Sequence, residues 1–193
     1  MSHRPPLPDD AADAEGVETP GILTGPEERD DRPSSHTPDE LRRALGRFAT
    51  GVTIVTCRDA AGVPTGLTAN SFNALSLHPP LVLWSLRVES PSTAAFVAAS
   101  HFAVNVLSAS QVSLSRRFAR PQRDKFDEGT WSDGLGGAPV LADCVAVFEC
   151  RRVSHQVAGD HLLFIGEVER LVEVDAAPLV YQAGHYREVG GPI

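Results

Sequence analysis

CVAVFECRRVSHQVAGDHLLFIGEVERLVEV, residues 144–174, is the stretch of sequence that decides the fold. It contains two long runs, 144–157 and 162–174, that are rich in β-branched and aromatic residues. The short turn Ala158-Gly159-Asp160-His161 separates them. Two such runs joined by a glycine-containing turn are typical of a β-hairpin, so we expect a pair of long antiparallel strands here.

Shorter strand-like runs surround this hairpin in the sequence. The further predicted strands are 52–57, 64–69, 81–86, 102–107 and a short one that includes 179–181. A polar loop is expected at 70–76 and a long loop at 120–139. Loops of the second length are uncommon in compact domains and are often functional.

Helices are expected on either side of the strands. The predicted helices are 37–51, 90–100 and 110–119. The first begins with Thr37-Pro38-Asp39-Glu40, which combines an N-cap threonine with proline and glutamate in the first turn, and Leu41, Leu45 and Phe48 then share one face. Ser90-Pro91 opens the second helix in a similar way.

The order of these elements favours a mainly β fold with α-helices at its periphery. About seven strands follow one another through hairpins rather than in regular βαβ alternation. The chain has neither a GxGxxG motif after a strand nor a GxxxxGK[ST] motif, so the Rossmann and P-loop folds lack their fingerprints. We therefore expect an antiparallel β-barrel with appended helices.

Charge divides the chain into two parts. Residues 1–36 contain nine acidic residues, three arginines and six prolines, while the whole chain has a formal net charge of −8. A segment of this composition cannot bury enough apolar surface to fold, so we expect a disordered tail at 1–36 and one folded domain at 37–193. The domain is nearly neutral, which argues against nucleic-acid binding.

Targeting signals and cysteines indicate a cytoplasmic protein. The N-terminus lacks the apolar segment of a signal peptide, and no apolar run is long enough to span a membrane. Cys57, Cys144 and Cys150 form no CxxC pair, so we expect buried thiols rather than disulfides or a zinc site. The sequence contains no HExxH and no GxSxG motif, so the zinc-protease and α/β-hydrolase classes lack support.

Three segments have the composition of a ligand site. Ser90-Pro91-Ser92-Thr93 offers hydroxyls and amides at a helix start, which suits a phosphate, although simple N-capping explains the same residues. The strand end Gly66–Asn73 is small and polar, which suits the edge of a flat heterocycle or a plain polar loop. Gly159-Asp160-His161 places a histidine in a hairpin turn, where it either meets a charged cofactor or is simply exposed.

In chain order, these segments resemble the flavin reductase family, whose fold is an FMN-binding split β-barrel with antiparallel, Greek-key-like strands and peripheral helices. The matching motifs are RFATGVTIVT (47–56), GLTANSF (66–72), SLHPPLV (76–82), SPST (90–93), FAVNVL (102–107), LSRRFA (114–119), KF (125–126), GDH (159–161), LFIGEV (163–168) and YQAGHYR (181–187). The resemblance covers about residues 40–188, which is the whole expected domain.

The resemblance implies where a flavin, FMN or FAD, would bind. It assigns the isoalloxazine and ribityl chain to Thr68, Ala69, Asn70 and Ser71, the ring edge to Ser85 and Leu86, and the phosphate to Ser90, Ser92 and Thr93. Further expected cofactor contacts are Asn105, Lys125, Gly159 and Asp160. His161 is expected near the nicotinamide as the catalytic residue, and no metal is implied.

The resemblance also implies an activity. NADH or NADPH would give a hydride to the flavin, and the reduced flavin would pass to a partner flavin-dependent monooxygenase; the protein would be a homodimer. Two other functions stay open on the same barrel: a non-enzymatic flavin-binding or electron-carrier protein, and an oxidase or haem-handling protein. The sequence does not separate FMN from FAD or NADH from NADPH.

Overall fold

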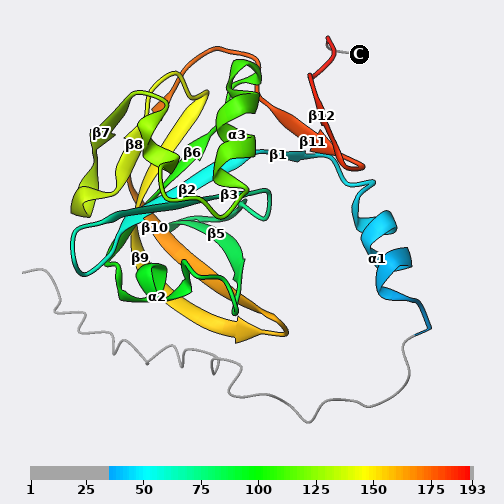
Figure 1. Cartoon of the computed structure of the whole chain (residues 1–193), viewed down its shortest axis with the longest axis horizontal. Helices are drawn as coiled ribbons and strands as arrows, with labels where there is room; N and C mark the ends of the chain where they lie inside the picture. Colours follow the sequence, from blue (N-terminus) through cyan, green and yellow to red (C-terminus); the bar gives the residue numbers. More distant parts are fainter. Residues whose placement is uncertain (1–34, 192–193) are drawn as a thin grey trace, which may run out of the picture. The chain divides into compact units, whose positions relative to one another are not determined.

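The hairpin expected from residues 144–174 lies at the centre of the main sheet of the computed structural model, which describes residues 35–191. Strand β9 (Ala146–Ala158) pairs with strand β10 (His161–Glu173) in an antiparallel ladder. The prediction of this hairpin is therefore confirmed (Figure 1). The expected disordered tail, residues 1–36, lies almost entirely outside the described residues.

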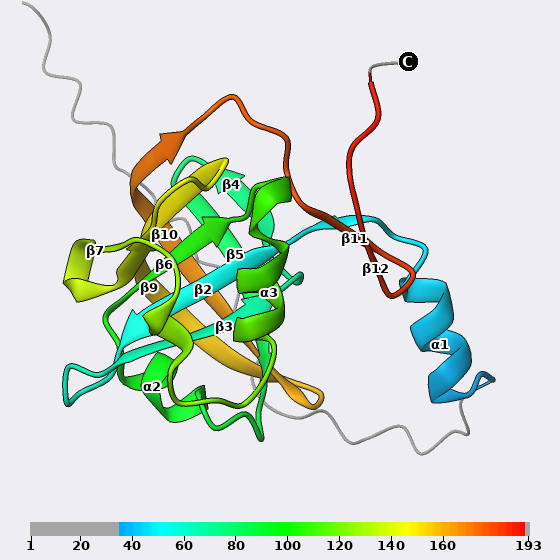
Figure 2. The same ribbon diagram turned by 45° about the horizontal axis from the view of Figure 1, so that its top comes forward.

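The main sheet has seven strands in the order β3-β2-β6-β9-β10-β5-β4, and all its neighbouring pairs are antiparallel. The other five strands are β2 (Thr53–Arg58), β3 (Pro64–Ala69), β4 (Asn73–Leu77), β5 (Pro80–Arg87) and β6 (His101–Val106). The sheet curls until β3 and β5, which are not hydrogen-bonded neighbours, come into contact (Figure 2). The expected antiparallel barrel is confirmed.

Aromatic side chains fill the interior of this barrel. Trp84 is fully buried and stacks on Phe164, with the ring centroids 4.7 Å apart. Phe96, from helix α2 (Thr93–Ala98), meets Trp84 edge-on at 4.8 Å. Each such pair adds about 0.5–1.5 kcal/mol beyond the area it buries. A buried ring therefore fixes α2 against the barrel.

A second apolar cluster holds helix α3 (Val112–Phe118) against β2 and β3. A short 3-10 turn, η1 (Ala109–Gln111), leads into this helix. Phe118 is buried, and a Cβ on Gly66 would lie only 2.9 Å from the Cε1 atom of its ring. Glycine at position 66 therefore lets α3 approach β3 closely.

The long loop expected at 120–139 contains more structure than was predicted. Its elements are η2 (Lys125–Asp127), β7 (Trp131–Asp133) and η3 (Leu135–Gly137), and β7 pairs with β8 (Pro139–Leu141). The rings of Phe126 and Trp131 pack on Phe118, with centroids 5.0 and 5.4 Å away. This aromatic packing anchors a segment whose sequence shows no helix or strand periodicity.

Helix α1 (Pro38–Leu45) begins as predicted and ends earlier than predicted. Thr37 and Glu40 form the expected capping box, in which the Glu40 amide donates to Thr37 Oγ1 over 3.2 Å. The helix stops at Leu45 and does not reach Gly51, because the following backbone pairs with a distant segment. Residues Thr50–Gly51 form β1, which pairs with β11 (Val180–Gln182), and β11 pairs with β12 (His185–Arg187).

Two other boundaries near the site also differ from the prediction. Helix α2 starts at Thr93 rather than Pro91, because the amides of Ser90 and Thr93 make turn hydrogen bonds of 3.0 Å to the carbonyls of Arg87 and Ser90. The loop expected at 70–76 contains strand β4, whose residues gain partners in β5. Both differences arise from long-range or turn hydrogen bonds that local sequence patterns do not reveal.

The cysteines are free and buried, as predicted. Burial raises the pKa of Cys57, Cys144 and Cys150 to about 12 in each case. Thiols of this kind are protonated and unreactive at neutral pH. Within residues 35–191, the helices are all too short or too polar to cross a bilayer.

Candidate functional site

Two adjoining cavities open beside the start of α2. The strand-end cavity, about 590 Å³, lies at the ends of β3 and β5, and the hairpin cavity, about 800 Å³, lies against the hairpin between β2 and β3. They share the wall residues Pro91, Ser92, Pro121 and Lys125. Both volumes fall within the range of roughly 300–1,000 Å³ that is usual for small-molecule sites.

The strand-end cavity brings together most of the residues predicted from the sequence. Its walls include Thr68, Ala69, Asn70, Ser71, Ser85, Leu86, Ser90, Ser92, Lys125 and His161. Strand register explains how distant segments meet, because His161 at the start of β10 pairs with Arg87 at the end of β5. Closure of the barrel brings the end of β3 to the same place.

Two polar side chains at the β3 end of this cavity, Thr68 and Asn70, have different roles. The Thr68 hydroxyl donates to the Ser115 carbonyl over 2.6 Å, so it fastens α3 to β3. Asn70 is exposed, and its side-chain amide has no hydrogen-bond partner within residues 35–191. Asn70 is therefore available to bond the edge of a heterocycle, while Thr68 shapes the wall.

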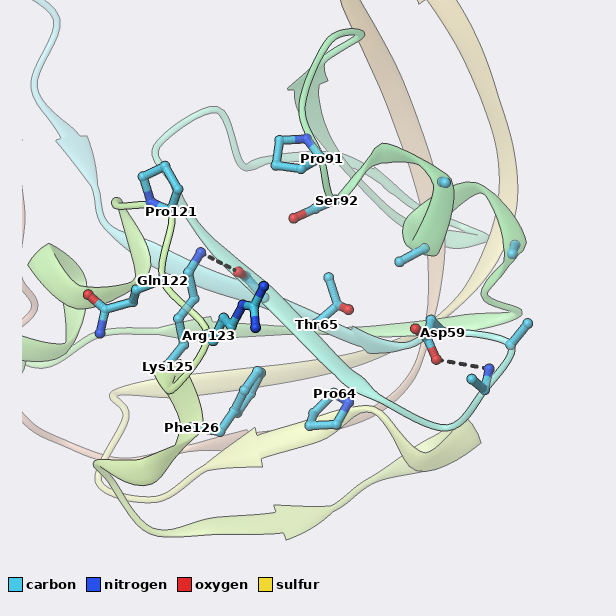
Figure 3. A pocket seen from close by; sticks show the side chains of 16 residues that line it. Asp59, Pro64, Thr65, Pro91, Ser92, Pro121, Gln122, Arg123, Lys125 and Phe126 are labelled. Atoms are coloured by element: carbon cyan, nitrogen blue, oxygen red, sulfur yellow. Dashed lines mark hydrogen bonds between the residues drawn. The ribbon is translucent and has the colours of Figure 1, made fainter.

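Lys125 lies where the two cavities meet. Its ammonium group donates to the carbonyl oxygen of Gly66 over 3.1 Å (Figure 3). It also donates to the carbonyl oxygen of Phe118 over 3.2 Å. Burial lowers the pKa of this half-buried lysine from its usual value of 10.5. Within the described part of the chain, no carboxylate lies at ion-pair distance from it. A cation held by two carbonyls, and lying 5.8 Å from the centroid of the Phe118 ring, still lacks an anion, which is the chemistry of a phosphate site.

Other charges around the cavities strengthen this preference for anions. The walls carry Arg87, Arg120 and Arg123 in addition to Lys125, and only Asp59 and Glu89 oppose them. Asp59 is already engaged, because its carboxylate accepts the amides of Ala61 and Val63 over 2.9 and 2.8 Å. In a chain with a net charge of −8, the cavities therefore form a local positive region.

Of the three hydroxyl residues at the start of α2, Ser90 and Ser92 line the strand-end cavity and Thr93 does not. Ser92 is the N-cap residue, yet its side chain makes no capping hydrogen bond, so simple N-capping does not account for it. Ser92 lines both cavities. The Thr93 hydroxyl instead donates to the Arg87 carbonyl over 3.1 Å, and Thr93 lines neither cavity. The prediction that Thr93 contacts phosphate is not supported by this position.

The hairpin turn places one of its three predicted residues at the cavity. His161 lines the strand-end cavity, and its Nδ1 atom lies 2.8 Å from Asp160 Oδ1. This hydrogen bond lowers the pKa of Asp160. Gly159 adopts a φ of 62° in the turn, a conformation that favours glycine. Asp160 and Gly159 do not line the cavity; Asp160 orients His161, and Gly159 shapes the turn.

Asn105 lies apart from the other residues of the site predicted from the sequence. It is 0% exposed and lines neither cavity. Its side chain donates to the Ile54 carbonyl over 3.0 Å and accepts the Leu141 amide over 2.8 Å. Asn105 therefore ties β6 to β2 and β8 inside the barrel, and its chemistry is already satisfied there.

Sequence reasoning missed several wall residues. These are Leu67, Arg87, Glu89, Phe118, Ala119, Arg120 and Pro121 in the strand-end cavity, and Asp59, Gln122 and Arg123 among those of the hairpin cavity. The run Arg120-Pro121-Gln122-Arg123 follows α3 directly and precedes Lys125. Three cations within six residues in a long loop were a signal that could have identified this wall.

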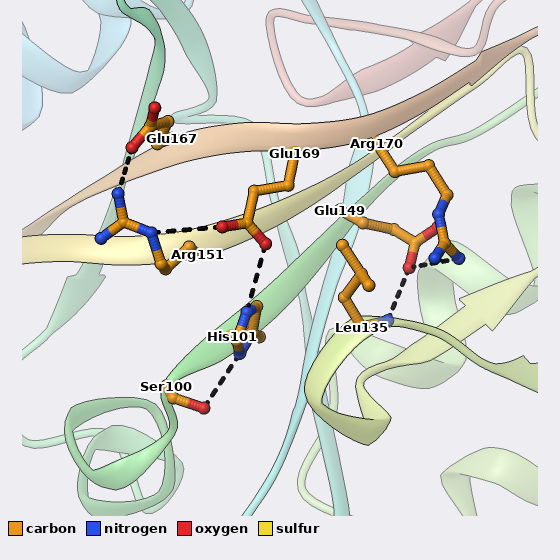
Figure 4. A network of polar contacts seen from close by, with 8 residues as sticks. All are labelled: Ser100, His101, Leu135, Glu149, Arg151, Glu167, Glu169 and Arg170. Carbon is orange, nitrogen blue, oxygen red and sulfur yellow. Dashed lines mark hydrogen bonds and ion pairs between the residues drawn. The ribbon is translucent and has the colours of Figure 1, made fainter.

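A separate polar network lies on strands β6, β9 and β10, and its residues line neither cavity (Figure 4). Arg151 pairs with Glu167 and Glu169, and Glu169 also lies 3.3 Å from His101 Nε2. The buried Glu149 pairs with Arg170. Because these charges are matched by opposite charges, the network stabilises the sheet. Residues 35–191 contain no cluster of side chains suited to a metal ion.

Comparison with known proteins identifies relatives of the chain. Residues 45–190 match the family described as "Flavin reductase like domain". The FMN reductase (NADH) of Agrobacterium fabrum is 46% identical over 154 residues, which cover 80% of this chain and 87% of that protein. The reductase component of the flavin-dependent trigonelline monooxygenase of Acinetobacter baylyi is 43% identical over 148 residues, 76% of this chain. This chain covers 47% of that relative, about half its length.

A solved structure agrees with these relatives. The NADH:FAD oxidoreductase of Streptomyces globisporus, in complex with NAD and FAD fragments, superposes with a TM-score of 0.75 at 38% identity. The match covers 79% of this chain and 92% of that one. The shared fold therefore extends over nearly the whole described domain.

Proposed function

Because the chain belongs to the flavin reductase-like family and has its split-barrel fold, we propose that it is an NAD(P)H:flavin oxidoreductase. The reaction moves a hydride from NADH or NADPH to FMN or FAD. One observation carries the proposal: the strand-end cavity joins a free amide, Asn70, to a cation without an anion, Lys125.

The residues present fit a flavin. A flavin needs a slot for a flat ring, polar groups for the ring edge and a cation for the phosphate. Leu86 and Ala69 offer apolar wall, Asn70 offers the amide, and Ser92 with Lys125 offers the phosphate seat. A bound flavin supplies the hydride-accepting ring, and the protein supplies binding and alignment. Alignment of two reactants is worth up to about 7–11 kcal/mol.

His161 serves the second substrate in this proposal. Its side chain is 39% exposed at the edge of the strand-end cavity, and Asp160 holds its ring by a hydrogen bond. An oriented, accessible imidazole at this edge can contact the nicotinamide without belonging to the flavin seat. We therefore assign His161 to nicotinamide binding and alignment.

A second copy of the chain completes the proposed site. Helix α1 and the turn after it carry an apolar surface that the monomer leaves uncovered, since Leu41 and Leu45 of the helix and Phe48 of the turn are 43%, 64% and 72% exposed. A third cavity of about 530 Å³ lies beside Leu45 and Phe48, and Asn70 lines both this cavity and the strand-end cavity. Dimerisation through α1 would cover the apolar face next to the flavin site.

The reduced flavin is proposed to pass to a partner oxygenase. A relative with 43% identity is named as the reductase component of a flavin-dependent monooxygenase, which supports this role. The proposed compartment is the cytoplasm, where NADH is available and where free thiols such as Cys57 stay reduced.

An oxidation assay tests the proposal. NADH or NADPH consumption is followed with riboflavin, FMN and FAD in turn, and anaerobic bleaching of the flavin confirms that the hydride reaches it. We expect turnover that depends on both substrates. Tight flavin binding without any NAD(P)H oxidation would instead identify a flavin-binding or electron-carrier protein and contradict the proposal.

A further inference from the structure

The hairpin cavity is larger than the strand-end cavity and is not used by the proposed hydride transfer. It is bounded by the β2–β3 hairpin, helix α2 and the loop at 121–126 (Figure 3). The two cavities share Ser92 and Lys125, the residues of the proposed phosphate seat. A ligand anchored there by a phosphate can therefore extend from one cavity into the other.

The walls of the hairpin cavity suit a flat, largely apolar group. Ala94, Ala95 and Ala98 of α2 present only methyl groups, so α2 leaves the space beside it open. Pro64 and Phe126 form facing apolar surfaces. The walls are not wholly apolar, because polar side chains interrupt them near the open side. Apolar walls with a few polar groups are typical of sites for heterocyclic ligands.

A second charge lies beyond the phosphate seat. Arg123 lines the hairpin cavity only and is exposed, and no carboxylate lies at ion-pair distance from it within residues 35–191. Gln122 also lines this cavity, and its side-chain Nε2 donates to Asp124 Oδ1 over 3.0 Å. Lys125 at the junction and Arg123 farther in thus supply cations for two successive phosphates.

We propose that the hairpin cavity binds the adenosine monophosphate half of FAD, with Arg123 as a specificity-determining residue. The inference rests on the proposed function and deepens it: the preferred flavin is FAD rather than FMN. The isoalloxazine and ribityl chain occupy the strand-end cavity, the pyrophosphate passes Ser92 and Lys125, and the adenine lies against the alanines of α2.

The nicotinamide dinucleotide also has an adenosine monophosphate half, and the positions of the wall residues decide between the two. His161, the proposed nicotinamide contact, lines the strand-end cavity and not the hairpin cavity. The hairpin cavity instead continues directly from the phosphate seat of the flavin. Its position therefore favours FAD.

Affinity for a series of flavins tests the inference without relying on activity. Riboflavin, FMN and FAD are titrated against the full chain, and flavin fluorescence reports binding. The steric variant is Ala94→Leu, which fills the cavity at an exposed helical position and keeps a good helix former. The charge variant is Arg123→Gln, and Arg187→Gln, at an exposed arginine that lines neither cavity, is its matched control.

We expect the wild type to bind FAD more tightly than FMN. Ala94→Leu and Arg123→Gln should each weaken FAD about tenfold, as expected for the loss of one charge-assisted contact or its steric equivalent, and FMN less than about twofold. Arg187→Gln should change neither affinity. Unchanged melting temperatures show that the variants remain folded.

Three results would overturn the inference. The first is an equal loss of affinity for FMN and FAD in the variants, and the second is no loss of affinity for either flavin. The third is a variant that changes the Michaelis constant for NADH but not that for reduced nicotinamide mononucleotide. The last would assign the cavity to the nicotinamide dinucleotide. Good binding of FMN without preference for FAD overturns the inference alone, whereas failure to bind any of the three flavins contradicts the proposed function itself.

Discussion

The Ser71 hydroxyl accepts the amide of Ser85 and donates to the carbonyl of the same residue, and both distances are 3.0 Å. This pair of hydrogen bonds joins Ser71, the second residue after β3, to Ser85 near the end of β5, and β3 and β5 share no strand ladder. It holds the barrel together at the strand-end cavity. Ser71 and Ser85 were predicted from the sequence as flavin contacts. In the structure, the two hydrogen bonds between them shape the wall of the strand-end cavity.

Ser71→Ala should destabilise the barrel at this seam. The change removes two hydrogen bonds at about 0.5–1.5 kcal/mol each, so we expect the free energy of unfolding to fall by about 1–3 kcal/mol. Chemical denaturation measures this fall. Ser113→Ala, at an exposed position of α3, is the control and should change stability by no more than about 0.5 kcal/mol. If Ser71→Ala and Ser113→Ala are equally stable, the hydrogen bonds between Ser71 and Ser85 do not contribute to the stability of the barrel.

Ser92→Ala and Thr93→Val should have different effects although the residues are adjacent. The Ser92 hydroxyl faces the cavities, so its loss should weaken FMN about tenfold and leave riboflavin nearly unchanged. The Thr93 hydroxyl bonds the Arg87 carbonyl, so its loss should lower the melting temperature and affect both flavins alike. Fluorescence titration and thermal unfolding separate the two. A selective loss of FMN with Thr93→Val would restore Thr93 to the phosphate seat.

FMN binding should depend on pH through Lys125. Burial lowers the pKa of Lys125 from its usual value of 10.5, and only the protonated form attracts a phosphate. The charge is present below that lowered pKa and is lost as the pH rises through it. FMN affinity should therefore fall at a lower alkaline pH than an ordinary lysine would produce. Riboflavin has the same ring without the phosphate, so its titration gives the background.

Two variants test the source of this pH dependence. Lys125→Met should shrink the difference between FMN and riboflavin to the part that Ser92 supplies, and that remainder should not decline in the alkaline range. Lys125→Arg should keep it and shift the decline to higher pH, because a guanidinium stays protonated. If Lys125→Met retains the full preference for FMN, the phosphate is bound elsewhere.

His161→Ala should act on the nicotinamide and not on the flavin. Loss of a ground-state contact raises the Michaelis constant for NADH, and loss of a transition-state contact slows flavin reduction. Asp160→Ala should produce a smaller effect in the same direction, since Asp160 only orients the imidazole over 2.8 Å. Stopped-flow bleaching measures both, and Gln156→Ala, an exposed position on β9, is the control. If the His161→Ala variant shows wild-type kinetics, His161 is a solvent-facing turn residue that does not contact the nicotinamide.

The sequence alone was enough to predict the central hairpin, five further strands and most of the wall of the strand-end cavity. Alternating apolar residues and the turn at 158–161 predict the central hairpin, because a strand buries one face and a glycine turn reverses the chain. The motifs around Asn70, Ser92, Lys125 and His161 predict the flavin-binding positions through their resemblance to a family, and the structure gathers these residues around one cavity.

Only the tertiary structure decided which polar residues face the cavity. Asn105 and Ser92 were both predicted as cofactor contacts, yet Asn105 satisfies buried backbone groups of β2 and β8 while Ser92 has no capping bond. Likewise, the length of α1 depends on the pairing of Thr50–Gly51 with β11, more than a hundred residues away. Local patterns report which face of a strand or helix is apolar. Folding brings together hydrogen-bond partners from distant parts of the chain. These partners decide whether a polar group is bonded within the protein or remains free to bind a ligand.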